Sequence, residues 1–186
     1  MAVIRVETEI KAPPQLCFDL KRSVDLHVTS TGDSGERAVA GVTQGLIGPG
    51  QEVTWSARHF WIRQELTSRV TAFDPPHHFR DSLVRGAFAR FDHDHYFEPH
   101  DGGTRMVDVF DYSAPLGLLG RFAEEVLLNR YMRRLLIERG LGIKMVAESG
   151  DHARYLGAGQ GAAGPGAGGG GRGPWGGAWT GVGTAA

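Results

Sequence analysis

The sequence predicts an α+β fold in which a curved antiparallel sheet packs against one long helix near the C-terminus. Short runs of alternating polar and apolar residues follow one another closely up to residue 112, which is typical of antiparallel strands with one solvated face. Apolar residues then recur at spacings of three, four and seven from Leu128 to Val146, as on one side of a helix. A helix packed on a curved sheet covers both apolar faces and can leave a pocket between them.

The first expected elements are a strand and two short helices. Residues 2–10 alternate between apolar and charged side chains, which indicates a half-buried strand. Pro13 and Pro14 favour the start of a helix that continues to about Arg22, because proline is well accommodated in a first helical turn. A second short helix is expected over residues 24–30.

Six further strands and the long helix complete the expected fold. The strands are rich in β-branched and aromatic residues and are bounded by turns that contain Gly or Pro. They are expected over residues 36–43, 52–59, 64–73, 78–85, 90–98 and 104–112. The helix is expected to begin after Pro115 and to run to about Glu148.

The composition divides the chain into a domain of residues 1–150 and a tail of residues 151–186. From Gly157 onward the tail is mostly Gly and Ala, with scattered Pro. Such a segment cannot bury enough side-chain surface to offset the entropy lost on ordering, so we expect the tail to be disordered. Function as an interaction module that acts through this tail is one alternative.

The net charge, the cysteine count and the length of the apolar segments limit the classes of function. The 20 basic and 21 acidic residues give a formal net charge of -1, so the chain lacks the excess of positive charge that is typical of nucleic-acid-binding proteins. Cys17 is the single cysteine, so an internal disulfide is excluded and a reducing compartment is favoured. No segment approaches the roughly 18 apolar residues of a membrane span. We therefore expect a cytoplasmic protein without an integral membrane segment or a nucleic-acid partner.

Two histidines share a strand face with two phenylalanines. In an extended strand Phe91, His93, His95 and Phe97 point one way, and the phenylalanines mark this face as the buried one. An unpaired polar group in an apolar interior costs roughly 1 to 3 kcal/mol. Partners for the two imidazoles are therefore expected inside the fold.

A two-residue turn at Asp101-Gly102 predicts the register of the strands on either side of it. Asp81, on the preceding strand, is expected opposite His93 or His95. The predicted pairs across the turn are Phe91 with Tyr112, His93 with Phe110, His95 with Asp108, and Phe97 with Met106. All of these side chains fall on the inward face, which supports the register, because a slip of one residue would turn every one of them outward.

The predicted inward residues form a candidate ligand-binding set. Trp55 and His59 join it from the strand over residues 52–59, where they alternate with outward polar residues. The set is Trp55, His59, Asp81, Phe91, His93, His95, Phe97, Asp108, Phe110 and Tyr112.

The polar members of this set leave several interpretations open. A structural network of Asp81, His95 and Asp108, a patch that orients a ligand, a zinc site and acid/base catalysis by His95 are all compatible with the pattern. Because no cysteine assists and the Asp-rich side of the strand faces water, we expect no metal and no other cofactor.

Several short motifs, in this order of elements, resemble the SRPBCC, or START-like, helix-grip superfamily over roughly residues 1–148. The motifs are Ala12-Pro13-Pro14, Phe73-Asp74-Pro75-Pro76, Arg85-Gly86-Ala87-Phe88, Gly103-Thr104-Arg105 and Tyr112-Ser113-Ala114-Pro115-Leu116-Gly117. The chain is most similar to small bacterial ligand-binding members, near the polyketide cyclase/dehydrase and coenzyme-Q-binding groups. This resemblance implies a seven-stranded antiparallel sheet wrapped around the C-terminal helix, with an apolar cavity between them.

The resemblance also implies a class of ligand. We expect the cavity to bind a small hydrophobic molecule such as a lipid, an isoprenoid quinone or a polyketide. The alternative is a polyketide-type cyclase or dehydratase in which His95, oriented by Asp108, moves a proton. Because no matching catalytic set is identified, we expect binding rather than catalysis.

Overall fold

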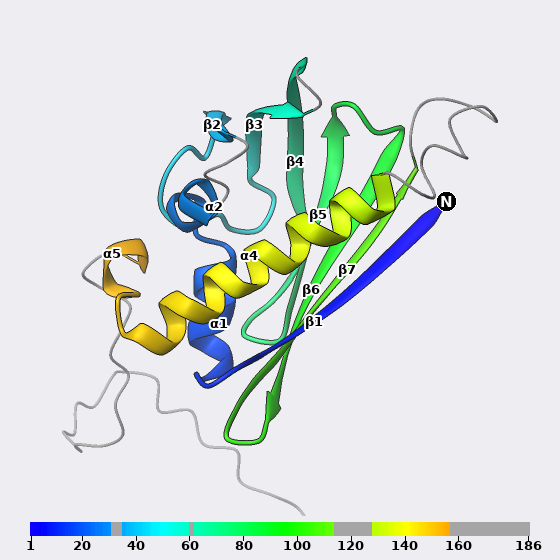
Figure 1. Ribbon diagram of the computed structural model, residues 1–186. Coiled ribbons are helices and arrows are strands. Elements are labelled where there is room, and N and C mark those ends of the chain that lie inside the picture. The colour runs from blue at the N-terminus through cyan, green and yellow to red at the C-terminus, as the bar shows by residue number, and fades with distance from the viewer. Residues whose placement is uncertain (31–34, 60–61, 114–127, 157–186) are drawn as a thin grey trace, which may run out of the picture.

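Seven antiparallel strands form one curved sheet in the order β1-β7-β6-β5-β4-β3-β2 (Figure 1). The computed structural model describes residues 1–30, 35–59, 62–113 and 128–156. The strands are β1 (Ala2–Ile10), β2 (Arg37–Gly41), β3 (Glu52–His59), β4 (Ile62–Asp74), β5 (His78–Arg85), β6 (Arg90–His100) and β7 (Gly103–Ser113). The α+β class and the antiparallel sheet are confirmed.

Four described helices accompany the sheet. They are α1 (Pro14–Lys21), α2 (Val24–Ser30), α4 (Asn129–Ser149) and α5 (Ala153–Leu156). The first two lie between β1 and β2 in the chain, and α4 runs diagonally across one face of the sheet (Figure 1). None of the helices in the described ranges has the length and hydropathy needed to cross a lipid bilayer.

Local sequence signals account for where these helices begin and end. Pro14 occupies the first turn of α1, where its missing N–H costs no helical hydrogen bond. At the other end of the chain, α4 stops at Gly150, which adopts φ 86° in the left-handed region that glycine tolerates best. The part of the predicted long helix over residues 115–127 lies outside the described residues.

The β6–β7 hairpin has the predicted register. Asp101 and Gly102 both have positive φ, at 46° and 74°, as a tight two-residue turn between twisted strands requires. His95 pairs with Asp108 and His93 pairs with Phe110 across the hairpin. On the other side of β6, Asp81 pairs with His93. The expected inward face is therefore assembled from β5, β6 and β7.

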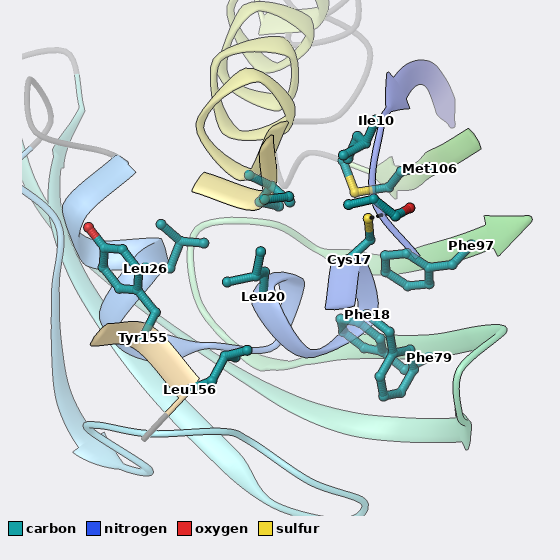
Figure 2. Close-up of a cluster of buried hydrophobic side chains, with 13 residues drawn as sticks. Ile10, Cys17, Phe18, Leu20, Leu26, Phe79, Phe97, Met106, Tyr155 and Leu156 are labelled. Atoms are coloured by element: carbon teal, nitrogen blue, oxygen red, sulfur yellow. Dashed lines mark hydrogen bonds between the residues drawn. The ribbon is translucent and has the colours of Figure 1, made fainter. Parts of the chain in front are cut away.

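A hydrophobic core forms where α1 packs against the sheet and the end of α4 (Figure 2). Phe18 of α1 lies edge-on to Phe79 and Phe97, with ring centroids 5.5 Å away in both cases. Tyr155 and Leu156 of α5 are buried in the same core. The apolar side chains of α5, which follows residue 150, therefore pack with those of α1 and the sheet. Residues 157–186, most of the predicted tail, lie outside the described residues.

Candidate functional site

A cavity of about 800 Å³ lies between the sheet and α4. Its volume is within the roughly 300 to 1,000 Å³ that small-molecule sites occupy. Strands β3 to β7 form one wall, and α1, α2 and α4 form the other. The apolar lining includes Leu20, Val24, Trp55, Leu66, Val70, Phe88, Phe91, Phe110, Met132 and Leu136. The space can therefore accept a molecule that is mostly hydrophobic.

The structure divides the ten candidate residues into groups. Those that line the cavity are Trp55, Asp81, Phe91, His93, His95 and Phe110. Phe97, Asp108 and Tyr112 are buried but are not among the described residues that line it. His59 ends β3, and its side chain is outside the described part of the chain.

Phe97 and Tyr112 face inward as expected, but helices cover them. Phe97 packs under Phe18 of α1, away from the cavity. The hydroxyl of Tyr112 donates a hydrogen bond to Oδ1 of Asn129, 2.7 Å away at the start of α4. Strand alternation predicts which face a residue occupies, but the positions of the helices decide which part of that face stays open.

A buried polar cluster stands behind the cavity wall, with Asp108 at its centre. Oδ1 of Asp108 lies 2.7 Å from Nδ1 of His95 and 3.1 Å from Nε2 of His93. The same oxygen lies 2.7 Å from Nζ of Lys21. The Asp108 side chain is 1% exposed. One carboxylate from β7 thus holds two histidines of β6 and the last residue of α1.

Asp81 faces this cluster from β5. Its Oδ1 lies 2.8 Å from Nε2 of His95 and 4.0 Å from Nδ1 of His93. Each histidine therefore has one ring nitrogen toward Asp108 and the other toward Asp81. Asp81, His93, His95 and Lys21 all line the cavity, so this polar cluster borders the space that a bound molecule would occupy.

Burial and neighbouring charges set the ionisation of this cluster. Burial and then the neighbouring His95 lower the pKa of His93 to about 4, so His93 is neutral at pH 7. Burial alone would raise the pKa of Asp108, but the Lys21 ammonium and the two histidines outweigh it and hold that pKa well below its usual range. Burial is likewise outweighed at Asp81, whose pKa is lowered chiefly by the hydrogen bond with His95. Both carboxylates are therefore ionised at neutral pH.

A second polar group lines the same cavity. Nη2 of Arg139 lies 2.9 Å from Oε2 of Glu36 and 2.8 Å from Nε2 of His27. The His27 ring stacks on Trp55, with centroids 3.9 Å apart. Burial and the Arg139 guanidinium lower the pKa of His27. A neutral His27 is therefore held between a cation, a carboxylate and an indole ring.

Sequence reasoning missed the cations of both polar groups, although each left a signal. Lys21 follows Cys17 by four residues and Phe18 by three, which places it on the buried side of α1. Arg139 follows Met132 by seven residues and interrupts the apolar stripe of α4. A cation on the buried side of a helix needs an anion inside the fold.

The fold is shared with solved structures of low sequence identity. No protein-family model matches the chain, and no curated protein matches it by sequence. The crystal structure of TTHA0849 from Thermus thermophilus covers 80% of this chain and 99% of its own, with a TM-score of 0.66 and 18% identity. Ara h 8.0201 gives a TM-score of 0.56 at 14% identity and covers 80% of this chain and 98% of its own. Ginseng major latex-like protein 151 from Panax ginseng gives 0.57 at 14% identity, with 78% and 97% covered. These likenesses show the fold, which is the helix-grip fold that the sequence resemblance implied.

Proposed function

We propose that this START-like, helix-grip domain binds a small, mainly apolar molecule that carries an oxygen acceptor. The observation that carries the proposal is Lys21. Lys21 lines the cavity with its side chain 6% exposed, and its Nζ, which is fully buried, donates no well-directed hydrogen bond to any described residue. Its contact with Asp108, at 2.7 Å, is an ion pair that leaves N–H groups free. A buried N–H group without an acceptor is costly, so a ligand oxygen that accepts a hydrogen bond from one of these free N–H groups would be stabilised.

The need for an oxygen that accepts a hydrogen bond from Lys21 selects among the ligand classes that the resemblance implies. Isoprenoid quinones and polyketides carry carbonyl groups on a largely apolar skeleton, and a fatty acid carries a carboxylate. Any of these oxygens could accept a hydrogen bond from Lys21 once the buried Nζ turns toward the cavity, while the rest of the molecule contacts Trp55 and Phe110 across the apolar wall. A plain hydrocarbon would leave the ammonium unsatisfied.

Proton transfer by His95 has weaker support than binding. Both ring nitrogens of His95 lie within 2.8 Å of carboxylate oxygens, one from Asp108 and one from Asp81. Neither nitrogen is therefore presented to a substrate without a rearrangement of the cluster.

Two measurements test the binding proposal. Native mass spectrometry of protein purified from its own cells should reveal a co-purified molecule with a carbonyl or carboxylate. In titrations followed by tryptophan fluorescence, 1,4-naphthoquinone should bind roughly 10- to 100-fold more tightly than naphthalene, since a hydrogen bond to a charged group contributes about 1.5 to 3 kcal/mol. Lys21→Met should remove this preference.

A matched pair of variants locates the binding. Ala57 lines the cavity from β3, so Ala57→Phe should fill part of it and weaken binding of naphthoquinone. Ala40 is exposed on the neighbouring strand β2, so Ala40→Phe should leave binding unchanged. Undiminished binding by Ala57→Phe would place the ligand elsewhere and contradict the proposal.

A further inference from the structure

A neutral His95 ring cannot form favourable hydrogen bonds with both of the carboxylates that contact it. A neutral imidazole carries one N–H, yet Nδ1 lies 2.7 Å from Asp108 and Nε2 lies 2.8 Å from Asp81. If Nδ1 donates to Asp108, Nε2 directs a lone pair at an ionised carboxylate. A positive centre between Nε2 and Asp81, either a proton or a metal ion, would convert this repulsion into attraction.

His93 shows the same division of its two nitrogens. Its Nε2 lies 3.1 Å from Oδ1 of Asp108, and its Nδ1 lies 4.0 Å from Oδ1 of Asp81. With N–H groups donated to Asp108, the remaining nitrogen of each histidine is the one nearer Asp81, and one ligand atom from each of the three residues lies within 4.8 Å of the other two. All three residues line the cavity.

We propose that Asp81, His93 and His95 bind a divalent transition-metal ion, such as Zn²⁺, at the wall of the cavity. Two imidazole nitrogens and one carboxylate oxygen are a donor set that such ions accept, and sites with three protein ligands keep a position open for water or another molecule. Metal–nitrogen and metal–oxygen distances of about 2.0 to 2.2 Å require His95 to move slightly away from Asp81 and His93 to move slightly toward it.

Asp108 supplies the support that such a site needs. Histidines that bind metals almost always donate their other ring N–H to a carboxylate or a carbonyl, which fixes the tautomer and the ring orientation. Asp108 is placed to do this for both histidines through the same oxygen. The Lys21 ammonium offsets the charge of Asp108, so Asp81 is the carboxylate whose charge is available to the ion.

The metal alone is sufficient to test this inference. Untagged wild-type protein, treated with a chelator and dialysed, should bind a single Zn²⁺ ion per chain in isothermal titration calorimetry. Asp81→Asn keeps the shape of the side chain but removes its charge, and should weaken binding by more than 10-fold. Asp108→Asn should weaken it by about 10- to 100-fold, as expected for an outer hydrogen-bond partner.

Two control variants separate this site from surface binding. Asp92 lies on the opposite face of β6 with its side chain 39% exposed, so Asp92→Asn should bind zinc as wild type does. His100 lies near the carboxylates of Glu9 and Asp101 at the end of the same strand, so His100→Gln should also leave the affinity unchanged. If His100→Gln abolishes binding, or Asp81→Asn does not weaken it, the inference is wrong.

X-ray absorption by the zinc-loaded wild type keeps the test independent of whether the variants fold. The expected spectrum has nitrogen and oxygen scatterers at about 2.0 to 2.2 Å with the outer-shell signature of two imidazoles. Absence of stoichiometric binding, or the signature of a single imidazole, would overturn the inference. Neither result depends on naphthoquinone, so failure of the metal site and failure of the proposed ligand binding are distinguishable.

Discussion

Nζ of Lys21 lies 2.7 Å from Oδ1 of Asp108, and both side chains are almost completely buried. This ion pair connects the end of α1 to the middle of β7. A buried pair contributes little net stability relative to an apolar pair, but loss of one partner leaves the other charge uncompensated in a medium of low polarity. The fold therefore depends on the presence of both residues more than on the attraction between them.

Lys21→Met should destabilise the protein strongly. Methionine preserves the length and apolar stem of the side chain but leaves the Asp108 carboxylate without its cation. We expect the free energy of unfolding to fall by about 3 to 5 kcal/mol, measured by urea denaturation. Lys144→Met is the matched control, because Lys144 pairs with Glu148 on the surface and should lose less than about 1 kcal/mol. Similar losses in the two variants would show that Asp108 does not need a counter-charge.

The β6–β7 hairpin shows what could be predicted from sequence. The Asp101-Gly102 turn fixes the register, and the period of two in the strands then fixes which residues face inward. Both signals are local, so the pairing of His95 with Asp108 required no knowledge of the remaining fold.

Contacts between helices and the sheet could not be predicted in the same way. Lys21 and Asp108 are far apart in sequence, and they meet because α1 docks on the sheet at a particular angle and depth. The periodicity of a helix shows which side is buried but not which strand it covers. The same limit explains why strand alternation alone predicts Phe97 at the cavity although α1 covers it.

Gly140 of α4 packs tightly against Thr8 of β1 and provides a test of that docking. A Cβ atom at Gly140 would lie 2.5 Å from Oγ1 of Thr8. Alanine favours helix over glycine by about 1 kcal/mol, so the contact opposes the intrinsic preference. We expect Gly140→Ala to destabilise the wild-type protein but to stabilise the Thr8→Ala variant by about 0.5 to 1 kcal/mol.

A double-mutant cycle of urea melts measures this coupling. In Thr8→Ala the contact with Oγ1 is removed, and the nearest remaining atoms are at 3.6 Å, an ordinary packing distance. Equal effects of Gly140→Ala in the two backgrounds would show that α4 does not pack against β1 at this distance.

Stability should fall as the pH drops below about 6.5, in part because of His27. Burial and the Arg139 guanidinium lower the pKa of His27 from 6.5 in the folded protein. Below pH 6.5 the unfolded chain therefore binds a proton that the folded chain does not, and stability is lost with a slope of up to about 1.4 kcal/mol per pH unit. Above pH 6.5 the contribution of His27 is fully present.

His27→Phe should flatten this dependence between pH 6.5 and 5. Phenylalanine keeps the stacking on Trp55 and removes the titrating ring. Measurements above pH 5 avoid the titration of Glu36, whose pKa is held well below its usual range by Arg139 and His27 despite burial. His77→Phe, at an exposed position, is the control. If the slope in His27→Phe equals that of wild type, His27 is not the source of the pH dependence.

The cluster around Asp108 should recover stability only when Lys21, His95 and Asp108 are replaced together. His95→Phe leaves Asp108 without one hydrogen-bond partner and should cost about 1 to 3 kcal/mol. Adding Asp108→Val would restore the loss if the two residues formed an isolated pair. Because Asp108 also neutralises Lys21, the double variant should instead leave the buried Lys21 ammonium without a counter-charge and remain destabilised.

The triple variant Lys21→Met, His95→Phe, Asp108→Val removes that ammonium and should regain most of the lost stability in thermal melts. The remaining deficit should come from His93, which loses its 3.1 Å contact with Asp108, and from Asp81, which loses its 2.8 Å contact with His95. A double variant as stable as the triple would show that Lys21 does not rely on Asp108. Binding of 1,4-naphthoquinone tests whether these charges serve the fold or the ligand. If the triple variant folds stably but no longer prefers the quinone over naphthalene, the charges are needed for ligand binding. Apolar side chains would then be sufficient for the stability of the fold.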